Sequence, residues 1–388
     1  MIEVEAIMAT RHKLRQQMPV ARRWAYFDHA AVAPIPQAAA DAITAWSQTA
    51  ALEGDTQWLD WNRRIEQIRR RSAELVHADP SEIALVPNTT AGVNIVAEGM
   101  PWERGDNVVI AANEFPTNQY PWINLQGRGV EVRRVPPDGF TIDPNRIADA
   151  CDGRTRIVSL SWVGYASGFR LDPQAMARVA HDAGALFFLD AIQGLGVFPL
   201  DVRDSEIDFF AADGHKWMLG PEGAGLFYCR GEHLDLLRPT GVGWNSVQGY
   251  FDYTTIDLKL RTTAARFEGG SQNMVGFHAL GASLDLLAAC GLTHNTSAVA
   301  ESVLQITRHA MDELNKIGAT IFSPREDEVR AGIVSFELPG HDSNDIRKAC
   351  LAGGVALACR DGRLRISPHA YNDEEDVERL IDTLSKCP

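Results

Sequence analysis

The sequence predicts an α/β fold in which a large domain, with a mostly parallel sheet flanked by helices, is followed by a smaller α+β C-terminal domain. Three observations predict it. Short, nearly continuous apolar runs alternate with helix-like stretches, a pattern typical of parallel strands buried on both faces. The chain has 388 residues, which is too long for one simple core. Beyond about residue 270 the pattern changes to long helices with few strands.

The elements are expected in the following order. A polar lead-in helix occupies residues 1–20, the large domain residues 21–270 and the small domain residues 271–388. The apolar runs that predict strands of the large sheet lie at 83–86, 108–112, 156–163, 186–190, 207–211 and 224–228. The helices expected between them lie at 89–97, 118–125 and 173–183. The small domain is expected to contain helices at 274–289, 297–317 and 374–384 and strands at 332–338 and 363–367.

Composition and charge exclude several classes of protein. Hydrophobic residues make up 45% and charged residues 23% of the chain, which is ordinary for a globular enzyme and excludes disorder. The net charge of −14 argues against nucleic acid or an anionic membrane as the main partner. No apolar run is long enough to span a membrane, and residues 1–20 contain no signal-peptide core. Six cysteines without a CxxC motif predict no metal site and a reducing, cytoplasmic location.

Four groups of reactive side chains follow or interrupt the predicted strands. Asp190 ends one apolar run, Lys216 follows the next, and Thr89 with Thr90 begins a helix after an earlier one. Arg365 lies within a strand of the small domain. Parallel α/β sheets bind ligands at the carboxyl ends of their strands, so these groups are expected to meet. Pyridoxal phosphate uses all four: a lysine for a Schiff base, a carboxylate at the ring nitrogen, a phosphate site, and an arginine for the substrate carboxylate.

Each residue alone has a plainer interpretation. Asp190 could cap a helix, Lys216 could be a solvated surface lysine, and Arg365 could form a rim salt bridge. Their order along the chain, each ending or flanking a strand, favours the cofactor. Competing chemistries lack their motifs, since the sequence contains no GxGxxG, GxxxxGK[ST], GxSxG or HExxH. A nicotinamide-dependent dehydrogenase is therefore excluded.

The chain resembles the class V aminotransferase superfamily of fold type I pyridoxal-phosphate enzymes. This superfamily includes cysteine desulfurases, selenocysteine lyases, isopenicillin-N-epimerase-like proteins and kynureninases. The resemblance runs from about Tyr26 to the C-terminus. The motifs that carry it are Tyr26-Phe-Asp-His-Ala-Ala31, Asn88-Thr-Thr90, Asp190-Ala-Ile-Gln193, Asp213-Gly-His-Lys216, Arg266-Phe-Glu-Gly-Gly-Ser271 and Arg365-Ile-Ser367.

The resemblance implies catalytic roles for two residues. Lys216 would carry the cofactor as an internal aldimine and move the proton at the substrate Cα, and Asp190 would pair with the ring nitrogen. The other residues that it assigns to the cofactor are Gln193 at the ring hydroxyl, Phe115 on the ring face, and Thr89, Thr90, Asp213 and His215 around the phosphate. Gly270 and Ser271 would complete the phosphate site of a partner subunit, which implies a homodimer with shared active sites. Arg365 and His29 would bind the amino-acid substrate.

Two departures leave the reaction open. Cysteine desulfurases carry a reactive cysteine on a loop upstream of the substrate arginine, whereas here Asp361-Gly362 predicts a tight hairpin turn. Cys359 beside that turn is interpreted as a packing residue. Gly164 stands where the family often has Asn or Gln near the ring, which leaves space or moves the contact to Tyr165. Phe115 could alternatively belong to the core.

The expected function is Cα deprotonation of an amino acid by a pyridoxal-phosphate enzyme, with transamination as the main interpretation. The alternatives are a C–S lyase or other β-eliminating enzyme, a desulfurase-like enzyme without the mobile cysteine loop, and a racemase. A catalytically degenerate scaffold is the non-enzyme alternative. The intact Lys216, Asp190 and Arg365 argue against it.

Overall fold

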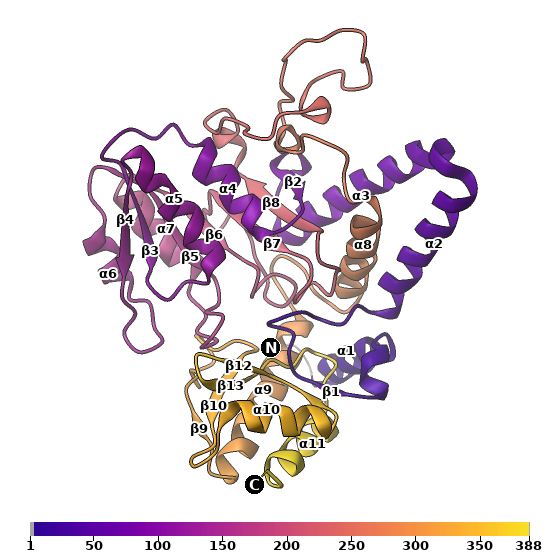
Figure 1. Ribbon diagram of the computed structural model, residues 1–388, viewed down its shortest axis with the longest axis vertical. Helices are drawn as coiled ribbons and strands as arrows, with labels where there is room; N and C mark the ends of the chain where they lie inside the picture. The colour runs from indigo at the N-terminus through magenta and orange to yellow at the C-terminus, as the bar shows by residue number, and fades with distance from the viewer. Residues whose placement is uncertain (1–3, 388) are drawn as a thin grey trace.

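The computed structural model describes residues 4–387 and contains a large and a small sheet, one above the other in Figure 1. The seven-stranded sheet has the order β2-β8-β7-β6-β5-β3-β4, and β8 runs in the direction opposite to the other six strands. Its strands are β2 Ile83–Val86, β3 Asn107–Ala111, β4 Glu131–Val135, β5 Thr155–Ser161, β6 Leu186–Asp190, β7 Phe209–Asp213 and β8 Gly225–Cys229. The predicted mostly parallel sheet is therefore confirmed.

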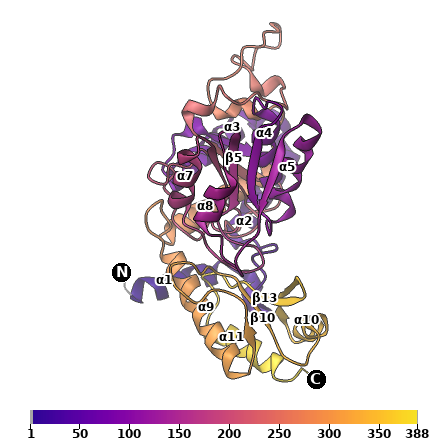
Figure 2. The same cartoon turned by 90° about the vertical axis from the view of Figure 1, so that its left-hand side faces the viewer.

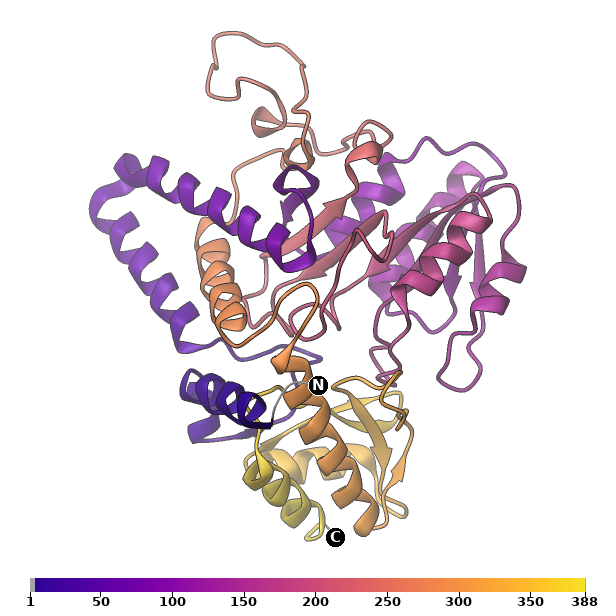
Figure 3. The ribbon, with the colours of Figure 1, turned by 180° about the vertical axis from the view of Figure 1, so that it is seen from behind.

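Helices cover both faces of this sheet because its central strands are apolar on both sides. In β6, Phe187 contributes to one buried cluster and Phe188 to the other, and Phe210 and Phe209 of β7 do the same. The helices of one face are α4 Thr89–Gly99 and α5 Tyr120–Asn124. Those of the other face are α3 Trp58–Val76, α7 Pro173–Asp182 and α8 Met274–Ala289. Figure 3 shows α8 beside α3 and beside α2 Gln37–Glu53.

The small sheet is antiparallel with the order β12-β13-β10-β9. Its strands are β9 Thr320–Ile321, β10 Val334–Glu337, β12 Ala358–Arg360 and β13 Arg363–Ile366. It packs with α9 Ala298–Lys316, α10 Ser343–Ala352 and α11 Glu374–Leu384 around a third buried cluster (Figure 2). The N-terminal region joins this part, since α1 Val4–Gln16 packs on α9 and β1 Ala25–Tyr26 pairs with β11 Val355–Ala356.

The predicted elements differ in how closely they match. Strands β2 and β6 and helices α8 and α11 have the predicted bounds, whereas β7 lies two residues later than expected and ends at Asp213. The expected helix at 118–125 is reduced to α5 between short 3-10 turns. The division of the chain at residue 270 stays a prediction. Helix α8, which follows it, packs against α2 and α3.

The strand before the predicted turn at Asp361-Gly362 is present as β12, whereas several elements were not expected from the sequence: α2, α3, α6 Pro144–Ala150, α10, β1, β4, β9 and β11. Helix α2 is rich in alanine on both its exposed and its covered sides, so it lacks a clear apolar stripe. Strand β4 lies at the sheet edge and is mostly polar. Within residues 4–387, no helix is long and apolar enough to cross a membrane. All six cysteines are free, and the cytoplasmic location stays a prediction.

Candidate active site

A pocket of about 290 Å³ opens at the carboxyl ends of β5, β6 and β7, where the small sheet meets the large one. It brings together most of the residues that the sequence singled out. Those that line it are Thr89, Thr90, Phe115, Asp190, Gln193, Asp213, His215, Lys216 and Arg365. The positions of all of them except Arg365 follow from the topology of the large sheet, because its parallel strands end at the same edge. Arg365 comes from β13 of the small sheet.

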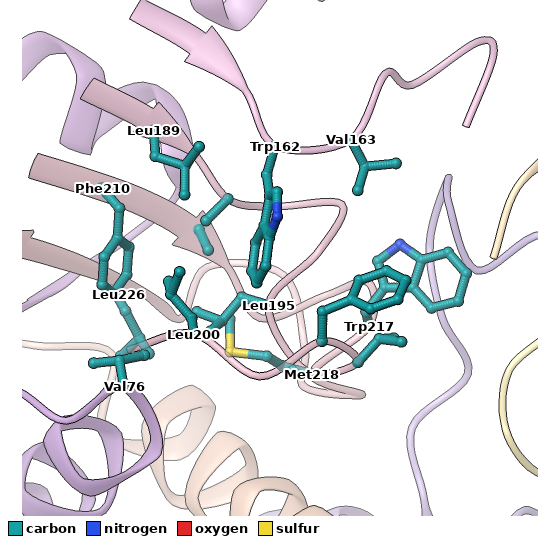
Figure 4. Packing of buried hydrophobic residues seen from close by; sticks show 14 of the residues in the cluster. Val76, Trp162, Val163, Leu189, Leu195, Leu200, Phe210, Trp217, Met218 and Leu226 are labelled. Atoms are coloured by element: carbon teal, nitrogen blue, oxygen red, sulfur yellow. The ribbon is translucent and has the colours of Figure 1, made fainter. Parts of the chain in front are cut away.

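Lys216 lies three residues after the end of β7 and is almost fully buried. The adjacent Trp217 packs into the core (Figure 4), and its indole N–H donates to Gln193 Oε1 at 2.8 Å. This anchor fixes the backbone that presents the lysine. Burial lowers the pKa of Lys216 to about 8, although Asp190 acts in the opposite direction. A larger fraction of neutral amine at physiological pH favours attack on an aldehyde.

Asp190 is the last residue of β6 and is buried at the base of the pocket. Its Oδ1 accepts a hydrogen bond from the Ile192 backbone N–H at 3.2 Å. Burial raises the pKa of Asp190 to about 6, while this bond and Lys216 lower it. A buried carboxylate with so little compensation would gain from a protonated ring nitrogen beside it.

The far end of the pocket is suited to a phosphate. Helix α4 begins at Thr89, and its N-cap Asn88 accepts from the Ala91 N–H at 2.9 Å. Thr89 Oγ1 accepts from the Asp213 N–H at 2.9 Å, which leaves its own hydroxyl hydrogen free to donate. His215 Nδ1 is 3.0 Å from Asp213 Oδ2, yet it is buried without a hydrogen-bond partner in the described chain. Hydroxyls, an imidazole and a helix N-terminus together form an anion site.

Arg365 supplies the cation opposite the phosphate end. It is 1% exposed and donates to the Tyr165 carbonyl at 2.7 Å and to Asp28 Oδ1 at 3.2 Å. Its Nε is buried and has no hydrogen-bond partner among residues 4–387. A guanidinium with an unused donor at a pocket wall fits a carboxylate ligand.

Three predicted residues lie outside this pocket. His29 is fully buried, and its ring nitrogens lie 2.8 Å from the Ser367 carbonyl and 2.9 Å from Tyr371 Oη. The expected substrate contact of His29 is therefore not seen, because both nitrogens already have partners. Gly270 and Ser271 line a separate groove beside Asn94. Their predicted role needs a second copy of the chain and stays a prediction.

Gln193 is held by the protein on both sides of its amide. Its Oε1 accepts from Trp217, and its Nε2 donates to the Ala30 carbonyl at 3.0 Å. One N–H of Nε2 remains for the expected bond to the ring hydroxyl.

Sequence reasoning missed some pocket residues and left others ambiguous. Phe115 is 43% exposed and meets Tyr165 edge to face at 5.2 Å, so it is not a core residue. A side chain at Gly164 would meet Ser167 Oγ at 2.7 Å, and the neighbouring Tyr165 lines the pocket instead. Arg360 also lines the pocket. Strand alternation indicates it in hindsight, because a two-residue turn places residues 360 and 365 on the same face.

Together, the parallel sheet, the buried lysine and aspartate, the anion site and the arginine define a pyridoxal-phosphate enzyme of fold type I. The family model for class V aminotransferases matches residues 25–380, and the chain belongs to this family. Pyridoxal phosphate, the predicted cofactor, is the cofactor of the family, and the residues of the pocket fit it.

Relatives and solved structures agree with this assignment. The chain is 32% identical to a probable cysteine desulfurase of Methanothermobacter thermautotrophicus, over 96% of this chain and 97% of the relative. It is 28% identical to an Escherichia coli cysteine desulfurase, over 96% of this chain and 97% of that relative. The cysteine desulfurase structure from Thermococcus onnurineus has a TM-score of 0.86 at 24% identity, covering 96% of both chains. The cystine C–S lyase C-DES has a TM-score of 0.88 at 24% identity, covering 96% of this chain and 100% of that one. These two structures confirm the fold.

Proposed function

We propose that this chain is a pyridoxal-phosphate-dependent lyase that cleaves the Cβ–S bond of a cysteine-derived amino acid by β-elimination. The observation that carries the proposal is the orientation of Cys359. In the β12–β13 hairpin, Cys359 pairs with Leu364, while Arg365 pairs with Ala358. Adjacent residues of a strand point to opposite faces, so Cys359 and Arg365 lie on opposite faces of the hairpin.

The turn of this hairpin leaves Cys359 no freedom to reach the pocket. Asp361 and Gly362 alone connect the strands, with φ of 51° and 78°, which is the positive-φ pair of a tight hairpin turn. Burial raises the pKa of the Cys359 thiol, which disfavours the reactive thiolate. The described residues that line the pocket include no cysteine. Sulfur would therefore leave with the product and would not be transferred to the enzyme.

The residues of the chain divide the reaction between them. Arg365 holds the substrate carboxylate, the Asp190 carboxylate balances a positive charge at the base of the pocket, and Lys216 Nζ takes the proton from Cα before the thiolate leaves from Cβ. Pyridoxal phosphate, when bound, withdraws electrons from Cα and so weakens the bonds there and at Cβ. The balanced reaction is R–S–CH2–CH(NH3+)–COO− + H2O → pyruvate + NH4+ + R–SH. Phe115 and Tyr165 form an aromatic wall on the pocket.

Arg360 favours a substrate with a second anionic group, such as cystine. It lines the pocket and donates to the Cys359 carbonyl at 2.9 Å. Within residues 4–387 it forms no ion pair with a carboxylate, unlike Arg365 with Asp28. A guanidinium that has no carboxylate partner among these residues and lies near the substrate arginine would attract the distal carboxylate of cystine. The curated relatives named as cysteine desulfurases support C–S cleavage over the predicted transamination.

An assay of the holoenzyme separates these reactions. Cystine, cysteine and alanine are supplied with and without 2-oxoglutarate, and keto acid, sulfide species and new amino acid are measured separately. We expect pyruvate and cysteine persulfide from cystine without a keto-acid acceptor, and unchanged turnover in Cys359→Ser. Turnover that requires the acceptor would support transamination. A persulfide trapped on Cys359, with loss of sulfide release in Cys359→Ser, would support a desulfurase.

We also propose that the enzyme is a homodimer in which Gly270 and Ser271 reach the phosphate site of the partner. The segment 241–262 projects from the large sheet (Figure 1) and exposes Val242, Trp244, Phe251, Tyr253, Ile256 and Leu258, with Ile256 94% exposed. An exposed apolar surface of this kind indicates a protein interface. Light scattering is expected to give a dimer mass for the active enzyme. A fully active monomer would contradict the proposal.

A further inference from the structure

Two imidazoles and a carboxylate meet on the surface of the large part of the molecule, away from the residues of the pocket. They belong to His77, Asp201 and His294, and their ligand atoms all lie within 4.8 Å of one another. His77 is exposed, and the other two are partly exposed, so an ion from solvent can reach all three. None of them lines the proposed active site.

The fold holds these residues on three separate segments. His77 follows α3 as its C-cap, Asp201 lies in the connection between β6 and β7, and His294 lies in the turn between α8 and α9. Backbone bonds join the segments: Val202 N–H donates to the Val76 carbonyl at 3.0 Å. Ser297 Oγ donates to the Val197 carbonyl at 2.6 Å.

The residues immediately before His77 and Asp201 pack into the same hydrophobic core. Val76 and Leu200, next to His77 and Asp201, belong to the same buried cluster (Figure 4). The backbone at both positions is thus fixed by packing before any ligand binds.

The carboxylate is oriented by its own loop. Asp201 Oδ1 accepts from the Arg203 and Asp204 N–H groups at 2.9 and 3.1 Å, and Oδ2 lies 2.8 Å from His77 Nδ1. The rings of His77 and His294 stack with centroids 4.6 Å apart and an angle of 24°. Because an imidazole lone pair lies in the ring plane, one exposed ring must turn about χ2 for both nitrogens to face one ion.

We propose that His77, Asp201 and His294 form a binding site for a divalent transition-metal ion of the Zn2+ class. Two imidazole nitrogens and one carboxylate oxygen are ligands that Zn2+ accepts, with water in the fourth position. Bonds of about 2.0–2.2 Å place two ligands of a tetrahedral ion about 3.4 Å apart. The contact of His77 Nδ1 with Asp201 Oδ2, now 2.8 Å, would therefore lengthen as the ion enters between them. The ion would join the end of α3, the β6–β7 connection and the α8–α9 turn, and so stabilise the folded chain.

The test uses Zn2+ alone on the tag-free holoenzyme after treatment with a chelator. Stoichiometry and affinity are measured by calorimetry, and the melting temperature is measured with and without Zn2+. His294→Ala removes a ligand from an exposed turn, and Asp201→Asn keeps the oxygen that accepts the two backbone N–H groups. The matched control is His309→Ala, because among residues 4–387 only one carboxylate oxygen, Glu313 Oε1, lies within 4.0 Å of the His309 ring nitrogens. Circular dichroism and cofactor absorbance confirm that each variant is folded.

We expect one Zn2+ per chain and a melting temperature that rises with Zn2+. His294→Ala and Asp201→Asn should each weaken binding at least about tenfold and abolish that rise, while His309→Ala leaves both unchanged. The absence of Zn2+ binding to the wild type would overturn the proposal. So would binding that neither variant weakens, and a thiolate-to-cobalt absorption band with Co2+ would then place the ion on cysteines.

Discussion

Two groups of buried polar and charged side chains in this molecule differ in how completely their hydrogen bonds are satisfied. Arg69 on α3 donates to the Ile83 carbonyl at 2.8 Å and pairs with Glu66 and Glu268. Glu268 in turn accepts from the Leu85 N–H at 2.8 Å. Burial alone would lower the pKa of Arg69, but these carboxylates raise it above its ordinary value. This cluster is complete and needs no ligand.

The pocket is the opposite case. Burial moves the pKa of Lys216 down to about 8 and that of Asp190 up to about 6, both toward neutrality. Arg365 Nε and His215 Nδ1 are buried without hydrogen-bond partners in the described chain. Buried polar atoms without hydrogen-bond partners cost stability, and a ligand that bonds to them recovers it. The comparison indicates which buried charges serve the fold and which await a cofactor and substrate.

The largest effect is expected for Lys216→Ala. Turnover should fall by at least about a thousandfold, because the group proposed to move the proton at Cα is lost. The fold should be retained, since the ammonium has no ion-pair partner within 4 Å in the described chain. Pyruvate release and circular dichroism measure the two effects. Near-normal turnover would show that another group is the base.

A substitution in the cluster of Arg69, Glu66 and Glu268 should change stability far more than catalysis. Glu268→Gln leaves Arg69 with less charge compensation and should lower the free energy of unfolding by about 3–5 kcal/mol. Turnover per folded molecule should fall far less than in Lys216→Ala. Denaturant unfolding and a pyruvate assay on the same sample test both points. If Glu268→Gln were as stable as the wild type, the Arg69 cluster would not stabilise the fold, and the contrast with the pocket would fail.

Unlike Glu268→Gln, Asp190→Asn should raise the free energy of unfolding of the cofactor-free protein. The pKa of Asp190 rises from 3.8 to about 6 on folding, so the folded state binds this proton more tightly than the unfolded state. Stability of the cofactor-free wild type is therefore lost as pH rises from about 4 to 6, by about 3 kcal/mol from this group. Above pH 6 the cofactor-free variant should be more stable than the wild type. With cofactor bound the order should reverse, and unfolding curves of both forms across this pH range measure it.

A smaller effect is expected for Arg365→Ala. Loss of a charge-assisted contact to the substrate carboxylate should lower kcat/KM for every substrate. The lost transition-state stabilisation should be about 1.5–3 kcal/mol. Arg363→Ala on the same hairpin is the matched control, because its partly exposed ion pair with Glu337 contributes at most about 1 kcal/mol to stability. Equal losses in both variants would indicate damage to the hairpin.

The sequence predicts the large sheet and the side chains at its carboxyl edge better than it predicts the outer helices, the edge strand and the contacts between distant residues. Asp190 ends a strand whose side chains are buried on both faces, and such apolar runs are recognised by composition alone. Helix α2 and edge strand β4 lack that signal. The position of His29 depends on its contact with Tyr371, and the cluster of His77 with His294 joins distant segments. Such contacts between distant residues follow from packing and not from local sequence.

The position of the cofactor on the chain tests the central claim most directly. The holoenzyme is reduced with borohydride and digested, and the pyridoxyl-labelled peptide is sequenced by mass spectrometry. The account predicts a single label on Lys216, within the peptide that contains Asp213-Gly-His-Lys. A label on another lysine, or a protein that holds no pyridoxal phosphate, would contradict it.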